Sequence, residues 1–203
     1  MWPSSNGYAY ETDMALPHLD RWLPDPVVRS HHRRAGRAGA EEMWSAAGTV
    51  RLSDTRALGR LVRWRIPDTP ADQSFGDLFR SYPFTVLEEG PRSLVSGLCG
   101  RIWTLARDYP ALEDDTAFRR WDADGTVRVL FAHWVEAIDD DEAELVTEAR
   151  VQPVDSGAAV RLRALWAAVG PFERLVGSEA LTAAVRRAEA DQARGRRAAR
   201  PPR

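Results

Sequence analysis

The periodicity of the chain changes at Asp155, and this change constrains the fold more than any other feature of the sequence. Before it, residues 126–138 and 144–154 alternate apolar and polar side chains, as strands with one buried face do, and a short acidic turn joins them. After it, apolar residues recur every three or four positions as far as Val185, which predicts one long helix. A hairpin followed directly by a long helix favours a helix packed across an antiparallel sheet.

Further strands and helices are predicted before this hairpin. In chain order they are a strand over 27–37, a helix over 41–47, a helix capped by Ser53 with Leu58, Leu61 and Val62 facing inward, strands over 84–89 and 94–104 joined by Gly90-Pro91, and a short strand over 118–121. Strands clustered in sequence favour antiparallel pairing over crossover connections. The predicted class is α+β, with a curved antiparallel sheet wrapped around a long C-terminal helix and two short helices after the first strand.

The chain divides into three predicted parts. Residues 1–26 form an N-terminal leader segment, partly disordered, because its first half is polar and rich in turn-forming residues. Residues 27–190 form the folded domain. Residues 191–203 form a disordered tail rich in arginine and proline. Gly170-Pro171 interrupts the stripe of the long helix and predicts a kink there.

Composition excludes several kinds of chemistry. The sequence contains no lysine, so all 28 basic residues are arginine, which rules out Schiff-base and P-loop lysines. The net charge of −2 gives no overall attraction to nucleic acid, and no nucleic-acid partner is expected. No apolar run reaches the roughly 20 residues that span a bilayer, so no stable membrane insertion is expected, and a cytoplasmic location is the default.

The sequence also contains no cluster of residues typical of a metal or cofactor site. Cys99 is the only cysteine, and the adjacent His31 and His32 point to opposite faces of a strand, so they cannot share one ion. We expect no metal site and no cofactor. Whether the protein forms a homodimer stays open.

Three stretches of this sequence resemble the START-related, helix-grip superfamily known as SRPBCC, which includes polyketide cyclases and lipid-transfer proteins. They are Val28-Arg-Ser-His-His32 with Ala40-Glu-Glu-Met-Trp44, Gly97-Leu-Cys-Gly-Arg-Ile-Trp103, and Thr147-Glu-Ala-Arg-Val151 followed by Leu165-Trp166 and Gly170-Pro171-Phe172. The resemblance implies a deep, largely apolar cavity between the sheet and the C-terminal helix. Ligands of this fold differ widely, so the resemblance does not choose one.

Six residues are candidates for contact with a ligand in such a cavity: Cys99, Trp103, Phe131, His133, Trp166 and Phe172. His133 lies on the apolar face of its strand and is the candidate polar anchor or acid-base group; the alternative is a core histidine bonded to the backbone. Cys99 is more simply a small packing residue. Arg101 is a second catalytic candidate, and the alternative places it at the solvent end of its strand. The sequence leaves open whether Leu98 or Cys99 points inward.

Three functions are compatible with the expected fold and these candidate residues. The first is binding of a small hydrophobic molecule, such as a lipid, a polyketide or a terpenoid, in the cavity. The second is a cyclase- or aromatase-like enzyme that uses His133 and Arg101 in the same cavity, so whether the protein is an enzyme stays open. The third is an interaction module with a filled core and no ligand.

Overall fold

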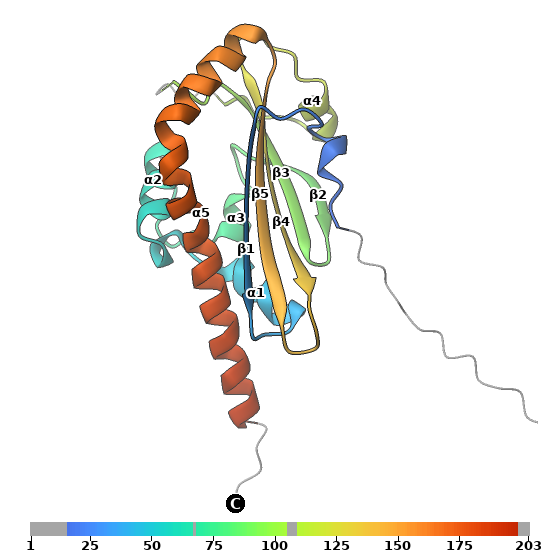
Figure 1. Cartoon of the computed structure of the whole chain (residues 1–203), viewed down its shortest axis with the longest axis vertical. Helices are drawn as coiled ribbons and strands as arrows, with labels where there is room; N and C mark the ends of the chain where they lie inside the picture. Colours follow the sequence, from blue (N-terminus) through green and yellow to red (C-terminus); the bar gives the residue numbers. More distant parts are fainter. Residues whose placement is uncertain (1–15, 67, 105–108, 199–203) are drawn as a thin grey trace, which may run out of the picture.

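Five antiparallel strands form one open sheet in the computed structural model, which describes residues 16–66, 68–104 and 109–198, without the side chains of 171–177. The strands are β1 (Val28–Gly36), β2 (Thr85–Gly90), β3 (Ser93–Gly100), β4 (Val127–Ala137) and β5 (Ala143–Pro153). Their order in the sheet is β1-β5-β4-β3-β2, so the first strand pairs with the last (Figure 1). Both predicted hairpins, β2–β3 and β4–β5, are confirmed.

Helices connect and cover this sheet. They are η1 (Leu19–Arg21), α1 (Ala40–Thr49), η2 (Leu52–Asp54), α2 (Ala57–Arg65), α3 (Phe75–Leu78), α4 (Asp115–Arg119) and α5 (Ser156–Ala198). Helices α1 and α2 follow the first strand and α5 ends the described chain, so the predicted α+β class is confirmed, and the arrangement is consistent with a helix-grip fold. No helix among the described residues is long and apolar enough to cross a membrane.

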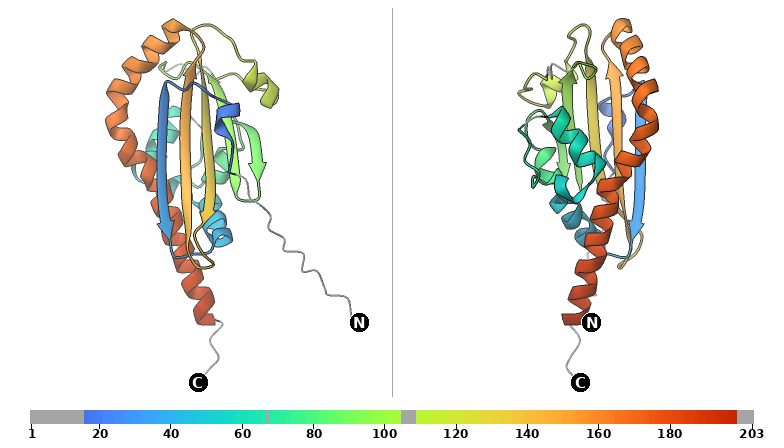
Figure 2. Two further views of the ribbon diagram at one scale, coloured as in Figure 1. Left: turned by 45° about the vertical axis from the view of Figure 1, so that its right-hand side comes forward. Right: turned by 90° about the vertical axis from the view of Figure 1, so that its left-hand side faces the viewer.

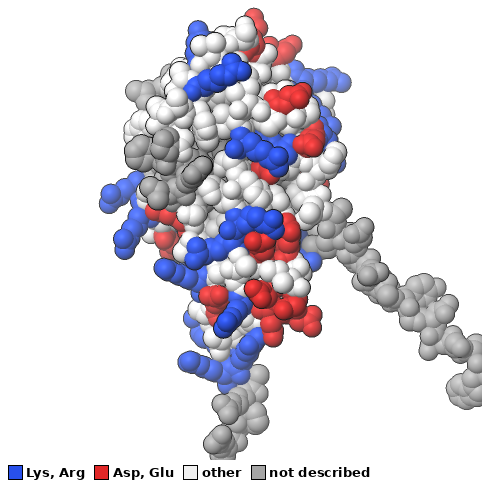
Figure 3. Space-filling model, in the orientation of Figure 1, with Lys and Arg blue, Asp and Glu red and all other residues white. Residues whose placement is uncertain are grey.

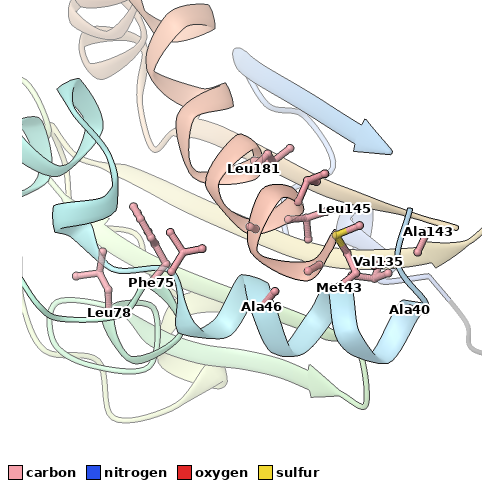
Figure 4. Close-up of a cluster of buried hydrophobic side chains, with 14 of the residues drawn as sticks. Ala40, Met43, Ala46, Phe75, Leu78, Val135, Ala143, Leu145 and Leu181 are labelled. Atoms are coloured by element: carbon pink, nitrogen blue, oxygen red, sulfur yellow. The ribbon is translucent and has the colours of Figure 1, made fainter. Parts of the chain in front are cut away.

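Helices α1 and α5 cover one face of the sheet, called here the inner face. Near the β4–β5 turn they bury the Met43 cluster, which includes Met43 of α1, Val135 and Leu145 of the sheet, and Leu181 of α5 (Figure 4). Near the start of α5 a second set, the Leu162 cluster, packs Leu162 against sheet residues that include Val129 and Val151. The inner face is therefore closed at both ends by apolar packing.

The N-terminal segment and α4 cover the opposite, outer face of the sheet (Figure 2, left). Leu19, Trp22 and Leu23 are buried there with Phe118 of α4 and with Leu130 of β4. The leader segment predicted over 1–26 therefore contributes part of the core, and residues 1–15 of it lie outside the described residues. Residues 19–23 contain only three apolar side chains, which are too few to show a period in the sequence, so their packing was not predicted.

Helix α5 continues beyond its predicted end at residue 190 and reaches Ala198. Glutamine, alanine and arginine make up six of the eight residues of this extension, and all three favour helix. Ion pairs also support it: Arg194 with Asp191 one turn earlier, and Arg196 with Asp141 of the β4–β5 turn. The helix is curved, and its two halves run in different directions (Figure 1).

Three local predictions were wrong. Strand β3 ends at Gly100, whose φ of 143° suits glycine and turns the chain away before Thr104. Residues 118–121 are not a strand; Asp114 accepts a hydrogen bond from the backbone N–H of Ala117 and starts the short helix α4 instead. Leu61, predicted to face inward, is an exposed side chain of α2.

Candidate functional site

A row of polar side chains crosses the middle of the inner face on three adjacent strands. His32 of β1 pairs with Thr147 of β5, and Thr147 pairs with His133 of β4. Residues opposite one another in antiparallel strands project to the same face, so the three side chains lie side by side. Ser30 stands two residues from His32 on the same face, and its Oγ lies 3.1 Å from Nε2 of His32.

The centre of the inner face is less closed than its ends. Val129, Val135, Leu145 and Val151 are buried, whereas four central residues of the same face keep part of their surface accessible: Phe131, His133, Thr147 and Ala149. These four lie between the Met43 cluster and the Leu162 cluster. Partial exposure in the middle of a helix-covered face indicates incomplete packing over this strip.

His133 is the central polar group of this strip. Its Nδ1 lies 2.9 Å from Oγ1 of Thr147, whereas its Nε2 is buried and has no hydrogen-bond partner among the described residues. Burial, with a smaller contribution from the positive charge of Arg80, lowers the pKa of His133 to about 4. The imidazole is therefore neutral near pH 7, with one ring nitrogen occupied and one unused.

Aromatic rings surround His133. The ring of Phe79 lies 4.4 Å from the imidazole, centroid to centroid, and contacts Phe84 and Phe131 at 5.0 Å and 5.4 Å. Ser96 of β3 holds the Phe79 segment in place, because its Oγ donates a 2.7 Å hydrogen bond to the carbonyl of Phe79. His133 thus presents an unused nitrogen within an apolar, mostly aromatic wall.

The neutral state of His133 predicts a pH-dependent stability. Between pH 6.5 and about 4 the unfolded histidine binds a proton and the folded one does not, so stability falls as the pH falls through this window. The expected loss over the whole window is about 3 kcal/mol. Urea unfolding at several pH values should show this loss in the wild type and in His31→Phe, a histidine on the outer face, but not in His133→Phe. An equal loss in both variants would contradict a His133 that stays neutral in the folded protein.

A hollow of about 280 Å³ opens beside the aromatic wall. Leu78, Ser81, Tyr82 and Pro83 line it, and they belong to the same segment that carries Phe79 and Phe84. Arg65 lies on its other side, with its guanidinium 5.2 Å from the ring of Tyr109 and a 3.0 Å hydrogen bond to the carbonyl of Ile102. The segment 78–84 therefore stands between this hollow and His133.

The structure brings some of the predicted site residues together. Phe131 and His133 share the inner face, and Trp103 and Trp166 pack against the Leu162 cluster at one end of it. The side chain of Phe172 lies outside the described residues, so its predicted role stays a prediction.

Cys99 does not belong to this site. Leu98 pairs with Val129 on the inner face, so Cys99 points to the outer face and is buried with Trp22 and Phe118. Burial raises the pKa of the Cys99 thiol to about 12, although the charge of Arg128 opposes the rise. The thiol stays protonated near neutral pH, which fits the packing alternative.

Arg101 also lies apart from His133. Because β3 ends at Gly100, Arg101 is in the following turn, where its side chain is exposed and its carbonyl accepts from Thr104. Arg65 of α2, by contrast, stands beside an aromatic ring and a hollow.

His32 and Thr147 were not predicted as parts of the site. The alternation of β1 places His31 or His32 inward, and the sequence signal for choosing is weak because both flanks are polar. Thr147 was placed on the apolar face of its strand, but its contact with His133 depends on the pairing register. These side chains lie next to His133 only because of the pairing register of β1, β5 and β4.

No protein-family model matches this chain, and no curated protein matches it. Several solved structures match this chain, with TM-scores below 0.4. A hypothetical protein from Helicobacter pylori is 12% identical, with a TM-score of 0.36 and coverage of 84% of this chain and 94% of that one. The Zhui aromatase/cyclase from Streptomyces sp. R1128 is 15% identical, with a TM-score of 0.35 and coverage of 80% and 93%. A di-domain aromatase/cyclase, BexL, from the BE-7585A biosynthetic pathway is 13% identical, with a TM-score of 0.33 and coverage of 80% and 46%.

Proposed function

We propose that this protein is a helix-grip protein that binds a small, largely apolar molecule over the central strip of the inner face, with Nε2 of His133 as the polar anchor. The observation that carries the proposal is this nitrogen, which is buried in an aromatic wall and has no hydrogen-bond partner in the described part of the chain. Leaving a buried polar group unsatisfied costs about 1–3 kcal/mol, so a ligand that hydrogen-bonds to it recovers part of that cost.

The protonation state of His133 indicates which ligand group fits. A neutral imidazole bonded to Thr147 through Nδ1 leaves Nε2 as either a donor or an acceptor, according to its tautomer. A hydroxyl group can hydrogen-bond to Nε2 in either tautomer, because it can both donate and accept. The preferred ligand is therefore apolar over most of its surface and carries one hydroxyl, as many lipids, polyketides and terpenoids do.

The same features argue for binding over acid-base catalysis. With its pKa near 4, His133 is a weak base at neutral pH, far from the value that serves proton transfer best. Arg101, the partner that a cyclase-like mechanism would need, stands in the turn after β3. The enzymatic alternative therefore has less support from the described residues than the binding function.

Two matched probes test this proposal: naphthalene and 2-naphthol, which differ only in a hydroxyl group. We expect the wild type to bind 2-naphthol more tightly, by roughly two- to tenfold beyond the ratio set by their solubilities, as one net hydrogen bond provides. His133→Phe should still bind naphthalene and should lose the preference for the hydroxyl. Fluorescence titration and calorimetry would measure both affinities.

His31→Phe is the matched control, because it changes a histidine on the outer face of the same sheet, near Trp134. It should keep the wild-type preference. If neither probe binds the folded wild type, the ligand-free interaction module becomes the better description. If His133→Phe keeps the preference, another group recognises the hydroxyl and the proposed anchor is wrong.

A further inference from the structure

Helix α2 has an exposed apolar stripe on its outer side. Leu61 and Trp64 are 48% and 56% exposed, although both are large hydrophobic side chains. They follow Ala57 at spacings of four and three residues, so the three side chains form one row along the helix. The inward side chains Leu58, Val62 and Ile66 pack against the Met43 cluster and fix the helix with this stripe outward.

A row of arginines runs beside the stripe. Arg56, Arg60 and Arg63 follow the same four- and three-residue spacing and are exposed, one helical position before the apolar row. Among the described residues, no ion pair or hydrogen bond engages any of their side chains. Several other arginines of the surface are paired, as Arg33 is with Glu144 and Arg187 is with Asp54. No acidic residue occurs between positions 55 and 67.

The two rows border an open groove of about 900 Å³, whose other wall includes Leu52, Ser53 and Ala71. Figure 3 shows basic side chains projecting along the edge of the molecule on which Figure 1 places α2, with acidic side chains beside them on this face. The exposed side of α2 thus combines accessible hydrophobic side chains with three arginines that form no ion pair among the described residues. The Glu179 carboxylate lies at the start of the helix, where it accepts from the backbone N–H groups of Ala57 and Leu58.

We propose that this side of α2 docks the protein on an anionic lipid bilayer. A tryptophan and a leucine favour the boundary between headgroups and acyl chains, and adjacent arginines favour anionic headgroups. A second copy of the chain fits less well, because two such faces would bring their unpaired arginines together. A soluble acidic macromolecule would use the arginines but would leave the apolar stripe without a role.

Docking through α2 would also place the bilayer beside the smaller hollow. Arg65 and Ile66, at the end of the helix, line the hollow of about 280 Å³ that adjoins the aromatic wall. A bilayer in contact with α2 would therefore lie close to that hollow, which the segment 78–84 separates from His133. The docking surface itself does not depend on the proposed ligand function.

Co-sedimentation with vesicles tests the proposal directly. Full-length protein is mixed with vesicles of phosphatidylcholine alone or of phosphatidylcholine and phosphatidylglycerol at 3:1, in low salt. Each basic residue near an anionic surface contributes roughly fivefold to binding, so the three arginines should favour the mixed vesicles by at least tenfold. Added salt should weaken this binding. Arg60→Glu/Arg63→Glu should reduce it by roughly 25-fold or more, and Leu61→Ser/Trp64→Ser by roughly tenfold.

Two control variants carry equivalent changes elsewhere. Arg161→Glu/Arg163→Glu alters two exposed arginines at the start of α5, and Ile138→Ser/Val160→Ser alters two exposed apolar side chains. Both should bind like the wild type, and circular dichroism should show every variant folded.

Three outcomes would overturn the proposal: equal wild-type binding to both vesicle types, equal losses in the control and α2 variants, or binding that soluble polyglutamate abolishes and that Leu61→Ser/Trp64→Ser leaves unchanged. The last would indicate an acidic macromolecule. The naphthol preference is measured without vesicles, so failure of docking and failure of ligand binding are distinguishable.

Discussion

Replacing Trp22 by alanine should lower the free energy of unfolding by about 3–5 kcal/mol, a large fraction of the stability of a domain of this size. Trp22 is only 2% exposed, and its ring meets Phe118 edge to face at 6.5 Å. The guanidinium of Arg119 stands 4.0 Å above the same ring, and the indole N–H donates to Glu88 at 3.3 Å. Truncation would leave a cavity between the N-terminal segment, α4 and the outer face of the sheet.

Trp64→Ala provides the matched control, because it removes the same side chain from the exposed side of α2. It should change the free energy of unfolding by less than about 1 kcal/mol. Urea unfolding followed by far-ultraviolet circular dichroism suits both variants, since neither removes a helix or strand. Equal effects of the two substitutions would mean that residues 19–23 do not belong to the cooperative core.

The contrast between these two tryptophans shows where sequence reasoning was strong and where it failed. The β4–β5 hairpin and α5 were predicted because each repeats its pattern over many residues, so the period identifies both the element and its buried face. Trp22 and Trp64 lie in short segments without such a repeat. Which of them is buried depends on what packs against each segment, and the partner of Trp22 is α4, almost a hundred residues later.

The same distinction between long regular strands and contacts that depend on distant segments applies to the candidate site. His133 was found because it interrupts an otherwise apolar face of a long, regular strand. Cys99 was wrongly grouped with it because β3 has glycines and small residues on both faces, and only pairing with β4 shows that Leu98 points inward. His32 and Thr147 were missed because their proximity to His133 is a property of the sheet order, in which the first strand joins the last.

The outer face also carries charged residues whose burial was not predicted. The alternation of β5 puts Glu148 and Arg150 opposite its apolar face, on the side of an antiparallel sheet that commonly faces solvent. They do lie on that face, but the N-terminal segment covers them, so their side chains are only 3% and 6% exposed. The Nε of Arg150 donates to Glu148 at 2.6 Å and its Nη1 to the carbonyl of Leu23 at 3.0 Å. Arg150 thereby joins the sheet to the segment that carries Trp22.

Arg150→Met should lower the free energy of unfolding by about 3–5 kcal/mol at pH 7, because it leaves the buried Glu148 carboxylate with Arg29 alone. Burial raises the pKa of Glu148, but hydrogen bonds and charge from Arg29 and Arg150 outweigh it, so the pKa lies below its ordinary value of 4.5. A lowered carboxylate pKa stabilises the fold above pH 4.5 and loses this contribution as the pH falls through the folded value. The difference between wild type and Arg150→Met should therefore shrink below pH 4.5.

Two further variants separate this network from an ordinary ion pair. Arg33→Met breaks the exposed pair between Arg33 and Glu144 and should cost no more than about 1 kcal/mol at pH 7. Arg150→Met/Glu148→Leu removes the stranded carboxylate as well, so it should recover part of the stability that Arg150→Met loses. If the double variant is no more stable than Arg150→Met, the cost arises from the lost bonds of Arg150 to Asp20 and Leu23, and the N-terminal segment is held through Arg150 and not through the charge of Glu148.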